Sequence, residues 1–270
     1  MQETPDATST ARAPHPHLYM LYRSTGGDHQ KHRPAYYSKM LCLRSFLRAF
    51  YRVRDRASVT FVNDGPVPED RRRIMEQWGC MVSLPGLGNS WSYRRTLAMA
   101  SALPEDSLVY FAEDDYLYTE PAFVKLLAVF EALPRVDYVT LFDNLDRYIR
   151  SDDARGGYSK VFVACGLHWR TVESACMTFG ARTARLKRDA WIHRVGTVSN
   201  SPADRFIWRC AQGEKWFFWK FPKRMLVGPM PSLATHMHSP GLAPNVDWYG
   251  IARDAENWWK QHHDGSDATA

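Results

Sequence analysis

The chain has no long hydrophobic run. None of its apolar stretches approaches the roughly 18–20 residues that a membrane-spanning helix needs, and its 270 residues hold no internal repeat or low-complexity tract. Residues 1–17 are polar, contain three prolines and lack the basic-then-apolar pattern of a secretory signal. Five scattered cysteines without a CxxC pair argue for reduced thiols and against a structural zinc site. We therefore expect a cytoplasmic protein.

The abundant residue types indicate a folded domain. With 45% hydrophobic and 13% aromatic residues, the chain can build a sizeable core. We expect one α/β domain over residues 17–261, between disordered tails at residues 1–16 and 262–270.

The net charge of +6 favours anionic ligands such as nucleotides, phosphates or an anionic membrane surface. Arg44, Arg48 and Arg52 recur at every fourth position of a predicted amphipathic helix. This stripe is either a solvated helix face or a docking face for an anionic acceptor or the periphery of an anionic membrane. No nucleic-acid-binding motif accompanies it, so a nucleic-acid partner is not expected.

Apolar, β-prone segments alternate with helical patterns along the first half of the chain. Strands are predicted at residues 17–23, 58–63, 80–84, 108–112 and 138–142, and helices at about 35–52, 69–78, 90–102 and 121–133. This alternation predicts βαβ units and a mainly parallel sheet flanked by helices. In the less regular second half, strands are predicted at 158–164, 168–172, 216–221 and 232–238, and helices at 182–194 and 201–210.

Three consecutive acids, Glu113, Asp114 and Asp115, follow an apolar predicted strand. They repel one another and suit neither a strand interior nor a hydrophobic environment. Alternation along an extended chain would place Glu113 and Asp115 on one face and Asp114 on the other. Two interpretations are open: a site for a hard divalent cation, which prefers oxygen ligands, or an acidic turn.

Two other predicted strands also end in polar residues. Tyr22-Arg23-Ser24 ends the first strand, and Asn63-Asp64-Gly65 ends the second. Ligands of open α/β sheets bind at the carboxyl ends of the strands. We therefore expect these residues and the three acids to form one site.

The order of six motifs resembles that of GT-A glycosyltransferases, and most of all the glycosyltransferase family 2-like group. The motifs lie within residues 17–240 and read YRSTGG, VNDGP, GNSWSYRRTLAMA, VYFAEDDYLY, TFGARTARL and SPADRFIW. The resemblance implies a Rossmann-like GT-A fold. Its nucleotide-binding half would span residues 17–145, and a smaller acceptor-side half would span residues 146–261.

The resemblance also implies roles around a nucleotide-sugar donor. VYFAEDDYLY corresponds to the DxD-type element, in which Asp115 would bind Mn²⁺ or Mg²⁺ while Glu113 and Asp114 serve the ribose and support the site. The chain reads Glu-Asp-Asp rather than Asp-x-Asp. Asp64 matches the acid that addresses the base or ribose, and an Asp-Gly turn is its other interpretation.

Further donor contacts are predicted from the first strand and from the helix after residue 88. Tyr22 and Arg23 would stack on the base and contact its edge, although Tyr22 also suits strand packing. Asn89 lies where a helix begins, either as the N-cap itself or just before Ser90, and a helix N-terminus favours an anion. Arg94 or Arg95 would add a phosphate contact, and adjacent helical residues diverge too far for both to do so.

Asp204, in SPADRFIW, matches the general base of an inverting enzyme, where the family often shows Glu-Asp. Its other interpretation is charge compensation at a helix N-terminus, and Asp143 and Asp146 are alternative bases. His236 or His238 would join the metal, with His236 favoured, and surface histidines or a separate zinc site are the alternatives. Trp208, Trp216, Trp219 and Trp248 are predicted to form a sugar platform or to pack in the core.

Together these inferences predict a metal-dependent glycosyltransferase. It would move a sugar, from a UDP-sugar by default, to a glycan, a lipid-linked acceptor or a small molecule. Two alternatives stay open: a nucleotidyltransferase with the same nucleotide-binding architecture, and a non-catalytic sugar- or nucleotide-binding protein.

Overall fold

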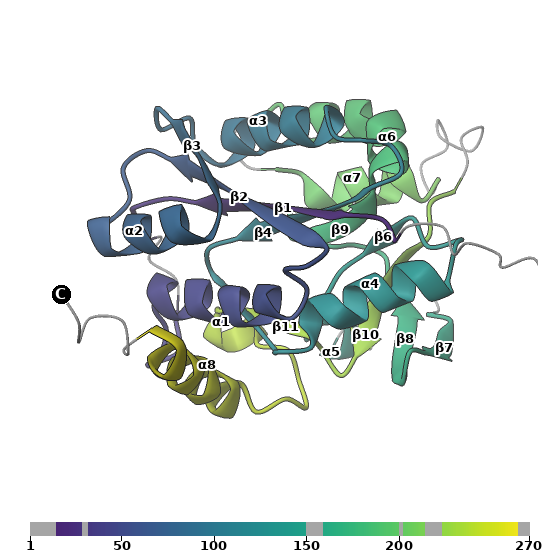
Figure 1. Ribbon diagram of the computed structural model, residues 1–270. Coiled ribbons are helices and arrows are strands. Elements are labelled where there is room, and N and C mark those ends of the chain that lie inside the picture. Colours follow the sequence, from purple (N-terminus) through teal and green to yellow (C-terminus); the bar gives the residue numbers. More distant parts are fainter. Residues whose placement is uncertain (1–14, 29–31, 150–158, 200–201, 214–222, 264–270) are drawn as a thin grey trace, which may run out of the picture.

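The computed structural model describes residues 15–28, 32–149, 159–199, 202–213 and 223–263 (Figure 1). The strands are β1 Leu18–Ser24, β2 Ala57–Asp64, β3 Cys80–Leu84, β4 Leu108–Glu113, β5 Tyr116–Tyr118, β6 Tyr138–Val139, β7 Val161–Ala164, β8 Leu167–Thr171, β9 Phe179–Arg182, β10 Leu226–Met230 and β11 Ala234–His236. The helices are α1 Lys39–Tyr51, α2 Glu69–Trp78, α3 Asn89–Ser101, α4 Ala122–Ala132, α5 Asp146–Ile149, α6 Thr183–Val195, α7 Asp204–Ala211 and α8 Trp248–His263.

The described strands form a nine-stranded sheet in the order β3-β2-β1-β4-β9-β6-β10-β8-β7 and a small β11-β5 sheet. In the large sheet β8 and β9 run against the other seven strands, so the prediction of a mainly parallel sheet is confirmed. The strands predicted at residues 158–164 and 168–172 are β7 and β8, which pair as an antiparallel hairpin at the edge of the sheet. The strand predicted at residues 216–221 lies outside the described residues.

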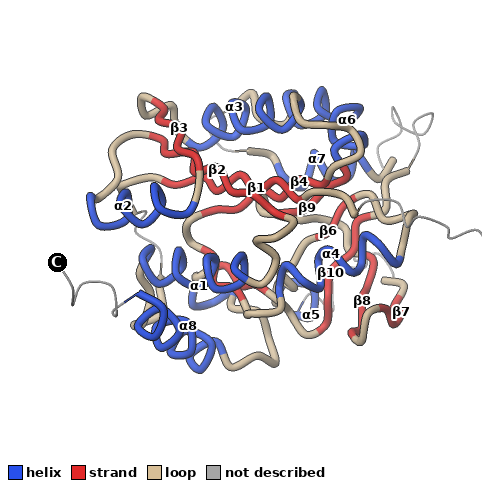
Figure 2. The backbone as a smooth tube through the Cα atoms, viewed as in Figure 1, coloured by secondary structure: helices blue, strands red, loops and turns tan. Residues whose placement is uncertain are grey.

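Helices cover both faces of the sheet (Figures 1 and 2). One core cluster joins the sheet to α1, α4 and α8, and a second joins the opposite face to α3, α6 and α7. Trp208 and Trp248 are 0% and 4% exposed within these cores, so neither belongs to a sugar platform. Trp216 and Trp219 lie outside the described residues. No helix among those described is long and apolar enough to cross a membrane.

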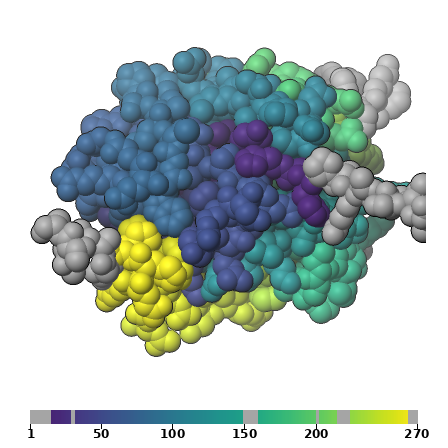
Figure 3. All heavy atoms as spheres, in the orientation of Figure 1, coloured from purple at the N-terminus to yellow at the C-terminus, as the bar shows by residue number. Residues whose placement is uncertain are grey.

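Helix α1 begins where the side chain of Ser38 accepts a hydrogen bond from the Leu41 N–H, four residues after the predicted start. The apolar face of α1 is buried against the sheet. Helix α8, which was not predicted, packs beside α1 (Figure 3). The arginine stripe is not a bare basic face, because Arg44 pairs with Glu256 and Arg48 with Glu120. Only Arg52, 58% exposed and 3.6 Å from Glu120, resembles the predicted solvated residue.

Strand register brings the polar strand ends together. Arg23 in β1 lies opposite Glu113 in β4, and Ser24 lies opposite Asn63 in β2. In the small sheet, His236 lies opposite Tyr116, the residue after Asp115. The first half and the last strand of the chain therefore meet at one edge, as expected for a ligand site.

Candidate functional site

The three acids between β4 and β5 have different partners, and Asp114 is the structural member of the trio. It is 7% exposed. Its Oδ2 accepts hydrogen bonds from the Thr25 N–H at 2.9 Å, the Ser24 hydroxyl at 3.1 Å and Lys39 Nζ at 2.9 Å. The guanidinium of Arg71 lies 3.6 Å away. Asp114 therefore ties the turn to β1, α1 and α2.

Glu113 connects the acids to the start of α3. One carboxylate oxygen pairs with Arg23, and the other accepts a hydrogen bond from the Thr178 hydroxyl at 3.1 Å. The same Arg23 guanidinium donates to the side chain and the carbonyl of Asn89, both at 2.6 Å, and to Ser92 at 3.1 Å. Arg23 thus contacts both Asn89 and Glu113, and all three were predicted as donor-binding residues.

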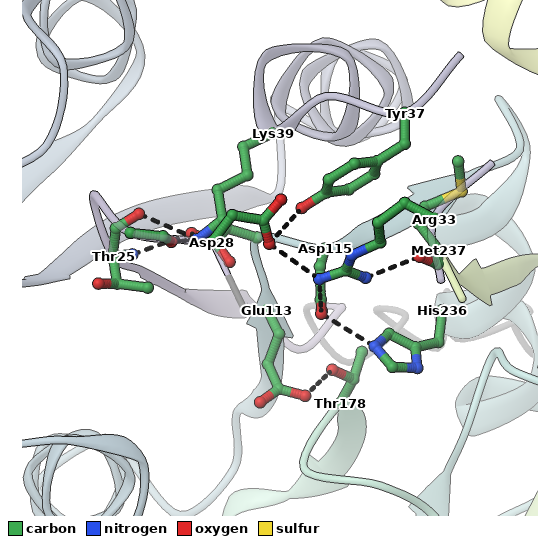
Figure 4. Close-up of polar contacts among 12 residues, drawn as sticks. Thr25, Asp28, Arg33, Tyr37, Lys39, Glu113, Asp115, Thr178, His236 and Met237 are labelled. Carbon is green, nitrogen blue, oxygen red and sulfur yellow. Dashed lines mark hydrogen bonds and ion pairs between the residues drawn. The ribbon is translucent and has the colours of Figure 1, made fainter. Parts of the chain in front are cut away.

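Asp115 faces the small sheet (Figure 4). Its Oδ2 lies 2.9 Å from Nε2 of His236 and 3.1 Å from a guanidinium nitrogen of Arg33. The Met237 N–H donates to the Asp115 carbonyl at 2.9 Å, which fixes β11 beside the turn. Of the two predicted histidines, His236 therefore lies at the acid. The His238 ring is 6.1 Å from the His236 ring.

The carboxylate oxygen of Asp115 and the imidazole nitrogen of His236 are donors that suit a divalent cation. Mn²⁺ and Mg²⁺ in nucleotide sites take one or two protein groups and complete their shells with phosphate oxygens and water. Within the described ranges, no three His, Cys, Asp or Glu residues gather as a metal cage. Two such groups fit an ion whose remaining ligands come from a bound phosphate group and water, and not one held by the protein alone.

The N-terminus of α3 has features that favour an anion. The N-cap is Gly88, not Asn89 or Ser90, and its φ of 82° lies in the region that favours glycine. The first turn of the helix has no acidic residue. Asp64 accepts hydrogen bonds from the Leu87 and Gly88 N–H groups at 2.6 and 2.7 Å and so fixes the loop before the helix. Two buried atoms nearby in the fold, Ser90 Oγ and Asn63 Oδ1, have no hydrogen-bond partner in the described part of the chain.

Two predicted donor contacts lie elsewhere. Tyr22 is 1% exposed, and its ring packs against Phe46 and Phe61, so it belongs to the core and cannot stack on a base. Arg94 turns away from the strand ends and donates at 3.0 Å to the carbonyl of Arg194, at the C-terminal end of α6. Alternation along β1 explains the first error, because Tyr22 and Arg23 point to opposite faces.

Asp204 is the first residue of α7 and lies on the same side of the sheet as α3. Burial raises its pKa, although the Arg205 N–H, which donates to the carboxylate at 2.6 Å, opposes this shift. The pKa of Cys176 is raised to about 11, first by burial and then by the charges of Asp204 and Glu113, while a hydrogen bond with Tyr116 opposes the shift. The Cys176 thiol is therefore within electrostatic range of both acids.

The alternative bases fit less well. Asp143 is 2% exposed and paired with Arg147 and Arg170, so its carboxylate is committed to a buried ion cluster. Asp146 is exposed at the start of the short helix α5.

Among the residues of the site, Arg33, Lys39 and Thr178 were not predicted. Lys39 bonds to Asp114 and to the carbonyls of Thr25 and Gly27. Thr178 begins the TFGARTARL motif, which was the one signal available for it. Arg33 carries no local signal, because its partners come from distant parts of the chain.

No protein-family model matches the chain, and a search of curated proteins finds no match. Among solved structures, residues 1–349 of the S. aureus glycosyltransferase TarS, in complex with UDP-GlcNAc, superpose with a TM-score of 0.50 at 13% identity, covering 90% of this chain and 66% of that one. The structure of S. aureus TarS has a TM-score of 0.49 at 13% identity, and the match covers 90% of this chain and 40% of that one. TarS 1–349 in complex with UDP has a TM-score of 0.47 at 13% identity, and the match covers 78% of this chain and 57% of that one.

The chain thus spans between 40% and 66% of the length of these three TarS chains. At 13% identity, the match with a TM-score of 0.50 shows a similar fold and nothing about activity. With the nine-stranded sheet flanked by helices, it assigns the chain a Rossmann-like glycosyltransferase fold.

Proposed function

We propose that this protein is a metal-dependent glycosyltransferase of the GT-A, family 2-like type. It takes a sugar from a UDP-linked donor, with UDP-GlcNAc as the first candidate, and transfers it with inversion to a glycan, a lipid-linked acceptor or a small molecule. The TarS complexes with UDP and UDP-GlcNAc motivate the choice of donor.

One observation carries the proposal. Asp115 and His236 form a 2.9 Å carboxylate–imidazole pair at the edge of the sheet where β1, β2 and β4 end. The Arg23–Glu113 pair leads from there to the N-terminus of α3, with its backbone N–H groups and the orphan Ser90 hydroxyl. A cation-binding pair joined to an anion-binding helix end matches the chemistry of a nucleoside diphosphate.

Each group then has a role. Asp115 and His236 would hold Mn²⁺ or Mg²⁺, which when bound supplies positive charge for the leaving diphosphate. The start of α3 binds phosphate oxygens, and Asp64 keeps that loop in place or addresses the ribose. Asp204 accepts the proton of the acceptor hydroxyl, and its raised pKa makes it a stronger base than an ordinary aspartate.

Calorimetric titration with UDP and with GDP, each with and without Mn²⁺, tests the proposal. We expect UDP to bind, and to bind much more tightly with Mn²⁺. Absence of binding by both nucleotides under both conditions would overturn it.

Incubation with UDP-GlcNAc and Mn²⁺ then separates the enzyme classes. A glycosyltransferase releases UDP, and when no acceptor is present it does so slowly by transferring the sugar to water. A nucleotidyltransferase instead acts at the nucleotide phosphate and retains the nucleotide on its product. Tight UDP binding with no UDP release in the presence of a panel of acceptors would favour a non-catalytic binding protein.

A further inference from the structure

Arg33 lies in the segment between β1 and α1 and already supplies a cation to Asp115 (Figure 4). One guanidinium nitrogen lies 3.1 Å from Asp115 Oδ2 and 3.1 Å from Asp28 Oδ1. The other terminal nitrogen donates to the Met237 carbonyl at 2.7 Å, and the guanidinium carbon lies 4.4 Å from the centre of the Tyr37 ring. The side chain is 11% exposed. A positive charge is thus held on the same oxygen that faces His236.

We propose that Arg33 is an internal counter-cation that competes with the divalent metal for Asp115. This inference rests on the proposed function, since it concerns the metal of the same site. A metal ion and a guanidinium on one carboxylate oxygen repel each other, so one must leave for the other to bind. The free protein then binds metal weakly, and metal and nucleotide bind tightly only together.

The donor diphosphate offers Arg33 a second position. A guanidinium binds phosphate oxygens through parallel hydrogen bonds, as it does carboxylates. The Nε–H of Arg33 is an unused hydrogen-bond donor, because it is buried and has no acceptor within the described ranges. Asp28, 43% exposed, anchors the guanidinium near the site when it leaves Asp115.

Lys39, another cation of this region, has a different role. Its amino group is held by Asp114 and by two backbone carbonyls, those of Thr25 and Gly27. It neutralises the buried Asp114 rather than the acid that faces His236. Of these two cations, only Arg33 competes for the metal position.

The test is a calorimetric titration of the nucleotide-free protein with Mn²⁺ alone. Arg33→Gln removes the charge, and we expect it to tighten Mn²⁺ binding by about tenfold, a typical size for a coupling between two sites. Arg33→Lys keeps a charge and should stay closer to the wild type. Arg73→Gln is the matched control, because Arg73 is 72% exposed on α2 and pairs only with Glu69 among the described residues.

A second charge-removing variant, Arg33→Met, keeps an aliphatic chain against Tyr37 and carries the test if Arg33→Gln fails to fold. Unchanged or weaker Mn²⁺ affinity in a folded charge-removing variant would overturn the inference, as would the same gain in Arg73→Gln. The outcome is separable from that of the proposed function. If UDP and GDP do not bind the wild type, the proposed function fails, while Mn²⁺ alone still decides whether Arg33 competes.

Discussion

The carboxylate of Asp115 and the imidazole of His236 lie 2.9 Å apart although 121 residues separate them in the sequence. The short antiparallel pairing of β5 with β11 produces this contact, since it places His236 opposite Tyr116. Strand β11 therefore completes a site that begins at the ends of β1, β2 and β4. Asp114, whose contacts are structural, and Asp115, which we propose as the metal ligand, are therefore neighbours in the sequence with different roles.

Asp115→Ala should remove Mn²⁺-dependent UDP binding. The cation would lose its anionic ligand, and we expect a loss of about 3 kcal/mol, roughly 100-fold in affinity. Calorimetry of UDP with Mn²⁺ measures this, with UDP alone as the reference. His236→Ala should weaken binding less, because it removes a neutral ligand. UDP affinity that is unchanged with Mn²⁺ in Asp115→Ala would disprove the metal-ligand role.

Asp114→Ala should act on stability instead. It would leave Lys39 and Arg71 in a buried site without the carboxylate that both face, so we expect a loss of about 3–5 kcal/mol in the free energy of unfolding. Urea denaturation measures this loss. Asp115→Ala is the comparison, and it should cost less because Arg33 keeps Asp28 as a partner. Equal costs for both variants would contradict the division of roles.

Much of the fold near this site could be predicted from local signals. The bounds of α2 and β3 match the prediction residue for residue, because Pro68 precedes the helix and Pro85-Gly86 follows the strand. The polar strand ends also met as expected, since parallel strands share an edge. The remaining features depend on contacts that no local pattern encodes.

Helix α8 and Arg33 illustrate what could not be predicted. Helix α8 is placed by packing on α1, with Glu256 paired to Arg44 across 212 residues. Arg33 has partners 82 and 204 residues away. Tyr22 is a different case, because a strand-end tyrosine suits a base and a core equally. Its alternation with Arg23 places it on the opposite face, where its ring packs against Phe46 and Phe61.

Asp204→Asn should stop transfer while sparing UDP binding. Because the pKa of Asp204 is raised above 3.8, its carboxylate takes up a proton earlier during acidification than an ordinary aspartate does. The activity that depends on this carboxylate should fall over the same pH range.

The raised pKa of Asp204 also affects stability. The folded chain binds the Asp204 proton more tightly than the unfolded chain, so ionisation lowers stability as pH rises. Asp204→Asn should therefore unfold at a slightly higher temperature at neutral pH. Retained release of UDP from UDP-GlcNAc would move the base elsewhere.

Asp143→Ala should destabilise the protein strongly. The carboxylate lies between Arg147 and Arg170 and also accepts a hydrogen bond from Tyr148. Without it, two half-buried or buried guanidinium groups face each other, at a cost of about 3–5 kcal/mol. Asp143→Asn keeps the shape and an acceptor oxygen, so it should cost less. Thermal unfolding of both variants gives the comparison, and a cost near zero for Asp143→Ala would rule out a structural role.

His193 should make stability depend on pH between about 4 and 6.5. It is 0% exposed between Phe179 and Trp208, with Nδ1 hydrogen-bonded to the Tyr93 hydroxyl at 2.8 Å. Burial lowers its pKa from 6.5 to about 4. Between these values the unfolded chain binds a proton that the folded chain excludes, so stability is full above pH 6.5 and falls on acidification. The loss reaches up to about 3 kcal/mol near pH 4.

Two variants separate this titration from the hydrogen bond to Tyr93. His193→Phe removes both, and its free energy of unfolding should lose the dependence on pH that His193 contributes. Tyr93→Phe removes only the hydrogen bond, so its stability should fall by about 1 kcal/mol while the pH dependence remains. Urea denaturation between pH 4 and 8 measures both curves. If the wild type and His193→Phe give parallel curves, the imidazole is not excluded from protonation in the folded chain, and the pH dependence comes from the acids.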